Sequence, residues 1–153
     1  MLETLRTENA GVKLSIIRYS DNSSEEEIPL SSGKFNPSPN EFIYLRTHVT
    51  NLSSERFIDR VQRPFLSQIT EIPLVFIVDL DMTPPEHVLF EGVLSNIPLG
   101  RLEPGTSQFV ETGVGFLCHG CFNIRAEVRI LGAPRSGRKA GMGEITAVVR
   151  EVL

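Results

Sequence analysis

The chain has 153 residues, of which 41 % are hydrophobic and 22 % are charged, and its formal net charge is −4. This composition is typical of one soluble globular domain, and the negative charge, the absence of Trp and the presence of only two Tyr argue against a nucleic-acid-binding protein. No secretory signal opens the sequence, and apolar runs such as Ile72–Val78 are too short to span a bilayer, so we expect a reducing, cytosolic location.

The first part of the chain is predicted to form one strand between polar segments. Residues 1–10 are polar and are expected to be a flexible extension of a single domain that spans 11–153. Apolar and polar residues alternate over Val12–Tyr19, which predicts a strand. The acidic segment Asp21–Glu27 and the segment Ser31–Asn40, which contains Pro and Gly, are predicted to be loops.

A second strand is predicted over Glu41–Thr50. Its alternation assigns one face to Ile43, Leu45, Thr47 and Val49 and the opposite face to Arg46, His48 and Thr50. Asn51, which begins a glycosylation sequon as Asn22 does, is interpreted as a turn residue that ends this strand. Glu55–Gln68 is compatible with either a short helix or an irregular crossing between sheets.

The second half of the chain is predicted to contain most of the strands, separated by short turns. The expected strands are Ile72–Leu80, Val88–Leu94, Gln108–Phe116, Cys121–Leu131 and Glu144–Val152. The first of these is continuously apolar, which predicts burial on both faces. The expected turn residues are Pro98, Gly100, Pro104 and Gly105.

The segment Cys121–Leu131 has the clearest alternation in the sequence. Phe122, Ile124, Ala126, Val128 and Ile130 share one face, and Asn123, Arg125, Glu127 and Arg129 share the other. Strands at short intervals without a long amphipathic helix predict an all-β fold, an immunoglobulin-like β-sandwich of about seven to eight antiparallel strands. The antibody hallmarks, a Trp in the core and a cysteine pair joining the sheets, are absent from the sequence.

The segment Cys118-His119-Gly120-Cys121 contains the only two cysteines and has CxxC spacing. A redox motif would need a helix after the first cysteine, and a structural zinc site would need two more ligands. We therefore interpret the segment as a tight turn in which Gly120 has positive φ and Cys118 packs as a small core residue. A thiol- or metal-dependent protein remains the third hypothesis.

No other pattern in the sequence predicts catalysis. Asp79 and Asp81 could form a metal pair, but we interpret them as turn residues at the end of an apolar strand. His48 is expected to be a solvated surface histidine. No GxSxG, GxxxxGK[ST] or GxGxxG motif occurs, so we expect no catalytic, cofactor-binding or metal-binding residues.

A glycine-rich basic loop over Gly132–Gly143 carries Arg135, Arg138 and Lys139. These three cations form a possible interaction loop for acidic lipid headgroups or an acidic protein patch, although lipid-binding clusters usually contain about 4–8 basic residues. A solvated hairpin tip is the simpler interpretation of the same segment.

Several segments resemble the C-terminal immunoglobulin-like region of the large subunit of the TRAPP II tethering complex, the fungal hypercellular protein A family. The resemblance is carried by Ile97-Pro98-Leu99 leading to Leu102-Glu103-Pro104-Gly105, by Gly115-Phe116-Leu117, by Gly120-Cys121-Phe122 and by LRTHVTNLS at Leu45–Ser53. It covers roughly residues 41–131.

The resemblance implies a non-catalytic fragment of a larger scaffold subunit in a complex that activates Rab GTPases by nucleotide exchange at the Golgi. It implies other TRAPP II subunits as partners, a Rab GTPase as an indirect partner, and a cytoplasmic location peripheral to Golgi membranes, with no cofactor. The alternative hypothesis is a membrane-surface or cargo adaptor that uses the basic loop 132–141.

Overall fold

The structure is a computed structural model that describes residues 10–52, 75–131 and 138–151. Ten strands and one 3-10 turn, η3 (Pro85–His87), occur within these ranges. The strands are β1 (Ala10–Tyr19), β2 (Glu25–Ile28), β3 (Lys34–Phe35), β4 (Phe42–Asn51), β5 (Val75–Thr83), β6 (Val88–Glu91), β7 (Ile97–Arg101), β8 (Ser107–Phe116), β9 (Gly120–Leu131) and β10 (Arg138–Val149).

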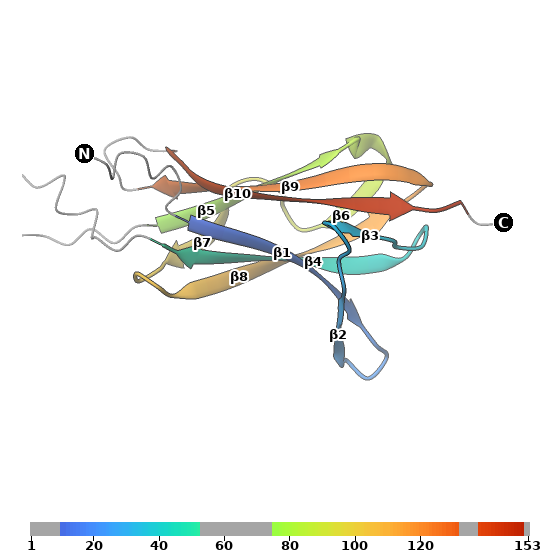
Figure 1. The fold of residues 1–153 in the computed structure, drawn as a ribbon, viewed down its shortest axis with the longest axis horizontal. Coiled ribbons are helices and arrows are strands. Elements are labelled where there is room, and N and C mark those ends of the chain that lie inside the picture. The colour runs from blue at the N-terminus through green and yellow to red at the C-terminus, as the bar shows by residue number, and fades with distance from the viewer. Residues whose placement is uncertain (1–9, 53–74, 132–137, 152–153) are drawn as a thin grey trace, which may run out of the picture.

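The strands form two five-stranded sheets that pack face to face (Figure 1). We name each sheet after its central strand: the β4 sheet has the order β2-β1-β4-β8-β6, and the β9 sheet has the order β3-β10-β9-β5-β7. All pairings are antiparallel except the short parallel pairing of β3 with β10. The predicted all-β sandwich is confirmed.

The core lies between the two sheets and is formed by the alternating residues of the longest strands. On β9 the five inward side chains predicted from the sequence are at most 2 % exposed: Phe122, Ile124, Ala126, Val128 and Ile130. They face the buried Ile43, Leu45 and Val49 of β4, which the alternation also placed correctly. The rings of Phe116 on β8 and Phe122 on β9 have centroids 4.9 Å apart. Burial of this apolar surface is the main source of stability in a sandwich.

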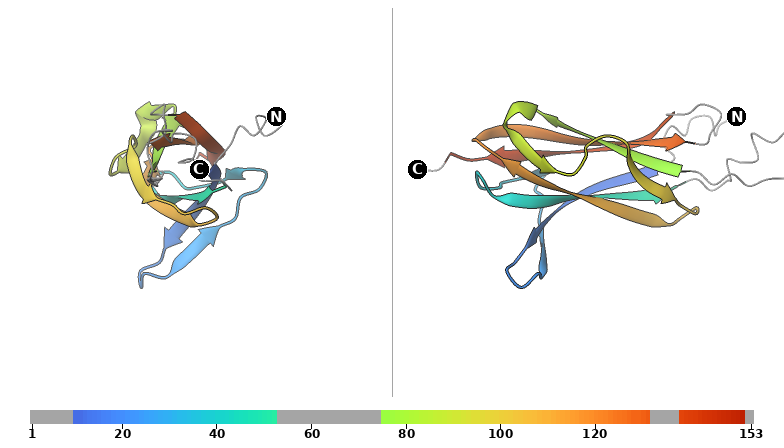
Figure 2. Two further views of the ribbon diagram at one scale, coloured as in Figure 1. Left: turned by 90° about the vertical axis from the view of Figure 1, so that its left-hand side faces the viewer. Right: turned by 180° about the vertical axis from the view of Figure 1, so that it is seen from behind.

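One side of the sandwich is closed by a close approach of β1 to β10. A Cβ atom on Gly141 would collide with the carbonyl oxygen of Ala10, and one on Gly143 would lie 3.1 Å from Cγ1 of Val12. Only glycine therefore lets the two strands approach this closely. Ala10 lies beside Gly141 and Val12 lies beside Gly143, so β1 and β10 run in the same direction. β1 begins at one end of the sandwich, and β10 ends at the opposite end (Figure 1, Figure 2).

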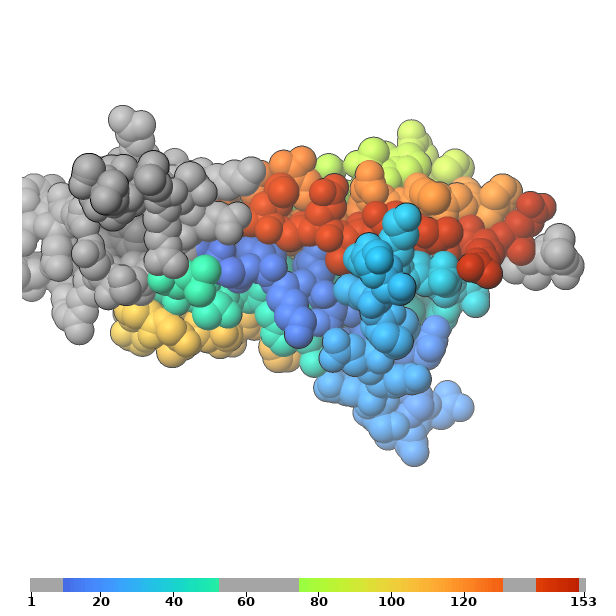
Figure 3. Space-filling model, viewed as in Figure 1, coloured from blue at the N-terminus to red at the C-terminus, as the bar shows by residue number. Residues whose placement is uncertain are grey.

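The strand count of ten exceeds the predicted seven to eight because short strands occur where the sequence predicts loops or turns. Within Asp21–Glu27, β2 begins at Glu25 and pairs with β1, and the β1–β2 hairpin projects from the body of the molecule (Figure 3). Within Ser31–Asn40, β3 pairs with β10, and the predicted turn residues Pro98 and Gly100 lie in β7. These segments are strands because a neighbouring strand offers hydrogen bonds, which local alternation does not report.

Three predicted boundaries in the second half are also wrong. β5 continues through Asp79 and Asp81 to Thr83, so these carboxylates lie within a strand and not in a turn. β6 ends at Glu91 and not at Leu94, because Gly92 has φ of +97° and interrupts the strand. β10 begins at Arg138 and not at Glu144.

Asn51 is the buried last residue of β4 and not a turn residue, since it is 2 % exposed and pairs with Ala10 of β1. Its Nδ2 donates to the carbonyl oxygen of Leu102 at 2.8 Å, and its backbone carbonyl accepts from Gly105 at 2.8 Å. Asn51 therefore fixes the Leu102-Glu103-Pro104-Gly105 turn that precedes β8. The uncertain segment Glu55–Gln68 lies outside the described residues.

Candidate functional site

The outer face of the β4 sheet carries a group of aromatic and aliphatic side chains that do not belong to the core. Phe42 lies over Gly113 and Gly115 of β8: a Cβ on Gly113 would collide with the Phe42 ring, and one on Gly115 would be 3.3 Å from Cδ1 of Phe42. The two glycines thus form a flat floor on which this ring rests. Edge-to-face contacts join Phe42 to Tyr44 at 5.7 Å and Tyr44 to Tyr19 at 5.1 Å between centroids.

Several of these side chains remain largely accessible. We define the outer patch as Tyr19, Phe42, Tyr44, Leu89 and Phe109, which the strand register places on the outer face of four adjacent strands. The exposed fraction is 45 % for Phe42, 46 % for Phe109 and 54 % for Leu89. Aromatic and aliphatic surface gathered in this way is typical of a recognition surface.

Arg46 of β4 organises the charged side chains beside the outer patch. Its Nε donates to Oε2 of Glu111 at 2.8 Å, its terminal nitrogen donates to Oε1 of Glu25 at 3.1 Å, and its guanidinium carbon lies 4.4 Å from the Phe109 ring centroid. Hydrogen bonding to Glu25 and then to Glu111 raises the pKa of Arg46 despite the opposing effect of burial. Tyr19 donates to the same Glu111 carboxylate at 2.9 Å, which raises the pKa of Tyr19. The network links four strands, β1, β2, β4 and β8, and holds the Phe109 ring in one arrangement.

His48 lies beside this network, on the outward face that the alternation predicted. It is half-buried, with its ring centroid 5.4 Å from that of Phe109, so the expectation of a solvated surface histidine is only partly met. Burial lowers the pKa of His48, and the positive charges of Arg46 and Lys13 lower it further. His48 therefore contributes a neutral ring to this face near pH 7.

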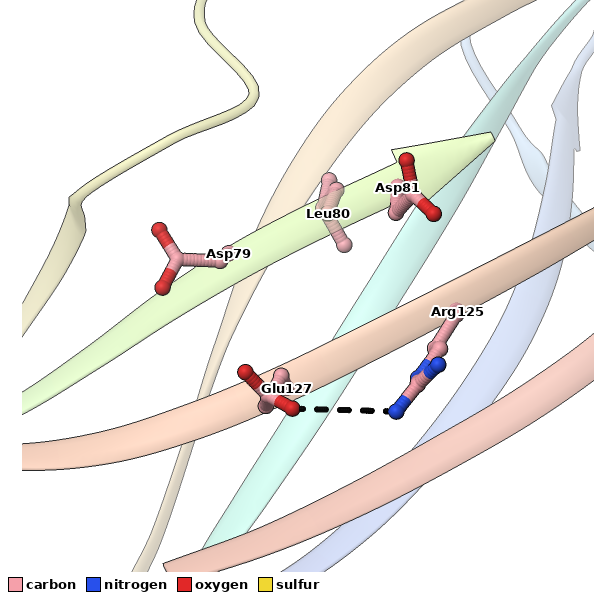
Figure 4. A pocket seen from close by; sticks show the side chains of 5 residues that line it. All are labelled: Asp79, Leu80, Asp81, Arg125 and Glu127. Atoms are coloured by element: carbon pink, nitrogen blue, oxygen red, sulfur yellow. Dashed lines mark ion pairs between the residues drawn. The ribbon is translucent and has the colours of Figure 1, made fainter. Parts of the chain in front are cut away.

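The outer face of the β9 sheet has a shallow pocket of about 230 Å³ lined by Asp79, Leu80, Asp81, Arg125 and Glu127 (Figure 4). Arg125 pairs with Glu127 at 3.8 Å across its floor. Asp79 is engaged by Nε of Arg129 at 2.6 Å and by the backbone amide of Asn96 at 2.8 Å. Burial alone would raise the pKa of Asp79, but these two hydrogen bonds and the Arg129 charge lower it overall.

These contacts give Asp79 a structural role that joins β5, β9 and the loop before β7. Nowhere in the described ranges do three or more His, Cys, Asp or Glu side chains form a group that could hold a metal ion. Of the three carboxylates that line the pocket, Asp79 is paired with Arg129 and Glu127 with Arg125, so these two are held in ion pairs on the sheet surface.

Residues 117–119 connect β8 to β9, so the predicted turn lies in the first half of the CxxC segment, and Gly120 and Cys121 are the first two residues of β9. Gly120 has φ of +140°, as expected for glycine in a tight connection. Cys118 is half-buried and packs against the core, as predicted, whereas Cys121 is exposed. Both thiols are free.

The structure does not gather the three predicted basic residues into a described loop. The backbone of Arg138 and Lys139 lies in β10, where these residues pair with Ile130 and Arg129 of β9, so the predicted loop 132–141 is too long. Arg135 lies outside the described residues.

Sequence reasoning missed the outer patch, although part of its signal was present. The alternation placed Arg46 and His48 on an outward face, and the spacing of Gly113 and Gly115 marks two outward positions without side chains. What could not be derived is the register, which brings Phe42 opposite Gly115 and Arg46 opposite Glu111.

Comparison with known proteins identifies the family. A search of curated proteins found no match to the chain. Among the described residues, no helix is long and apolar enough to cross a membrane. Residues 11–151 match the family described as Trs120/TRAPPC9, fourth Ig-like domain, in agreement with the two-sheet fold and with the resemblance noted in the sequence. The chain therefore belongs to the family of Ig-like domains of this TRAPP subunit.

Proposed function

We propose that this domain is a non-catalytic interaction module that docks its subunit onto another subunit of a TRAPP II-type complex. The outer patch carries this proposal, since Phe42, Phe109 and Leu89 are each close to half exposed on a rigid sheet. Arg46 holds the Phe109 ring and Glu111 holds Tyr19 without a partner, so these two side chains would lose little freedom on binding.

Family membership supports a wider role within this proposal. A subunit with such a domain would contribute to vesicle tethering and to Rab activation at the Golgi as a scaffold, with the Rab GTPase as an indirect partner. Under this proposal the chain acts at the cytoplasmic face of Golgi membranes. Family membership supports the assignment to a TRAPP subunit, and the exposed patch supports docking by this domain.

The proposal is tested with the double variant Phe42→Ser/Leu89→Ser in the full-length subunit. Both side chains are exposed and on the outer face, so the fold should persist while co-purification of the other TRAPP subunits falls. Met142→Gln is the matched control, because Met142 is an exposed apolar residue (36 %) on the other sheet.

Thermal unfolding of the isolated domain checks that both variants are folded. Normal co-purification of the double variant would refute docking through the outer patch. Equal losses in the double variant and in Met142→Gln would show that removing any exposed apolar group is sufficient, which would also refute it.

A further inference from the structure

Most sheet edges in the described part of the chain are protected against pairing with another strand. β3 has two residues and β6 has four, and β2 has four residues with three consecutive glutamates. β7 carries Pro98 and an irregular register against β5. The free side of β1 is covered by β10, because the carbonyl oxygens of Ala10 and Val12 lie against Gly141 and Gly143. Proteins usually protect a sheet edge in these ways: the edge strand is short, carries charged residues or proline, pairs irregularly, or is covered by another segment.

The first half of β8 has little of this protection. β8 pairs with β4 over Ser107–Gly115, but with β6 only over Gly113–Phe116. Its residues 107–112, SQFVET, therefore have no described strand on their second side, and they include neither Lys nor Pro. The one charged side chain, Glu111, is held by Arg46 of β4.

The direction of the free backbone groups follows from two hydrogen bonds. The amide of Asn51 donates to the carbonyl of Thr106 at 3.0 Å, and the amide of Leu117 donates to the carbonyl of His87 at 2.9 Å. Because bonding direction alternates along an antiparallel strand, even-numbered residues of β8 bond towards β4 and odd-numbered residues point the other way. The open edge therefore presents the amide and carbonyl groups of Ser107, Phe109 and Glu111.

The charges around this edge indicate what it would bind. Glu91 lies at one end, where β6 pairs with Gly113, and Glu103 lies at the other, where its carbonyl accepts from the Thr106 amide. Neither residues 107–112 nor β6 contains a basic residue. Phe109 adds exposed aromatic surface beside the open groups. A segment with Lys or Arg next to apolar residues complements this edge in charge and in polarity.

We propose that an extended segment of another TRAPP subunit, with basic and apolar residues, adds to the open edge of β8 as a strand collinear with β6. This inference rests on the proposed function and names the contact that docking would use. Main-chain hydrogen bonds to Ser107, Phe109 and Glu111 would provide affinity, and the flanking carboxylates would select a basic segment.

A matched pair of substitutions at Phe109 separates the backbone from the side chain. Phe109→Ala and Phe109→Pro both remove the ring, but only proline removes the outward amide, and proline is tolerated at an edge where that amide faces solvent. In the full-length subunit, we expect Phe109→Pro to bind the other TRAPP subunits about tenfold more weakly than Phe109→Ala does. Equal binding by the two variants would overturn strand addition.

Residue-resolved hydrogen exchange supplies a second readout that does not depend on a variant. On addition of the other TRAPP subunits, exchange of the Ser107, Phe109 and Glu111 amides should slow, while the even-numbered amides are already protected by β4. Unchanged exchange at the three odd positions would overturn the inference.

The remaining outcomes distinguish this inference from the proposed function. If wild-type subunit assembles, Phe42→Ser/Leu89→Ser does not, and Phe109→Pro equals Phe109→Ala, then docking stands and strand addition is wrong. Protection of the odd amides in the dilute isolated domain would show that the edge is filled within the chain. Protection of the same amides that grows with domain concentration would mean that a second copy of the domain occupies the edge. Either of these two results in the isolated domain would overturn the inference. Failure of the wild-type subunit to assemble would overturn both proposals.

Discussion

Replacing Thr47 with valine should stabilise the domain. Thr47 lies at the centre of β4, it is 0 % exposed, and its Oγ1 has no hydrogen-bond partner among the residues that the structure describes. An unsatisfied buried hydroxyl costs about 1–3 kcal/mol, because its bonds to water in the unfolded chain are not replaced. Valine has nearly the same shape and keeps the β-branch that a strand favours, so this cost would disappear without a cavity. We therefore expect the free energy of unfolding to rise by about 1–3 kcal/mol.

Thermal and urea unfolding of the isolated domain would measure this change. For a chain of this size, 1 kcal/mol raises Tm by about 2–4 °C. Thr47→Ser is the matched control: it keeps the hydroxyl and loses a buried methyl, so it should destabilise by about 1 kcal/mol. An unchanged or lower Tm for Thr47→Val would refute the reasoning, since it would mean that the hydroxyl is satisfied in the folded domain.

Other predictions concern packing and pH. Phe122→Ala should lower the free energy of unfolding by about 3–5 kcal/mol, measured by urea unfolding, because the buried ring fills the space between the sheets; a loss below about 1 kcal/mol would contradict its core position. Gly141→Ala should lower the free energy of unfolding by about 1–3 kcal/mol, because the added Cβ collides with β1. Gly11→Ala is the control and should lower it clearly less, because its added Cβ would meet Leu52 at an ordinary contact distance of 3.5 Å. Equal Tm values for the two variants would refute the close approach of β1 to β10. The pKa of Asp79 is lowered in the folded domain, so its contribution to stability is present above pH of about 4 and is lost as the pH falls through this lowered pKa. Asp79→Asn should reduce the loss of stability at acidic pH, measured by unfolding as a function of pH. An unaltered pH profile would argue against the ion pair with Arg129. The pKa of His48 is also lowered, so on acidification the unfolded chain is protonated at His48 before the folded domain is, and stability should fall as the pH drops below about 6.5. His48→Gln should remove this pH dependence of the free energy of unfolding. If the pH dependence persists in the variant, it belongs to another group.

The sequence predicts the long strands and the fold class because alternation is strong where one face is buried. Between Phe122 and Ile130 of β9 the five inward residues are apolar and the four residues between them are polar, so the face assignment needs no tertiary information. The Gly120 turn follows as well, because positive φ has a local chemical signature.

What the sequence does not predict depends on partners that are distant in the chain. β2 and β3 are strands because β1 and β10 pair with them, and Asp79 lies inside β5 because Arg129 and the Asn96 amide satisfy its carboxylate. The outer patch has the same origin, since Phe42 rests on glycines more than 70 residues away in the sequence.

The course of β1 and β10 gives the domain a mechanical property. β10 has twelve residues, so it spans about 40 Å. With β1 beginning at one end of the sandwich and β10 finishing at the other, a pull between the flanking segments acts along both strands. β1 would have to slide against β4, and β10 against β9, so that whole ladders of hydrogen bonds would resist in shear and would break together. A force directed along these two strands would therefore meet the resistance of both ladders at once.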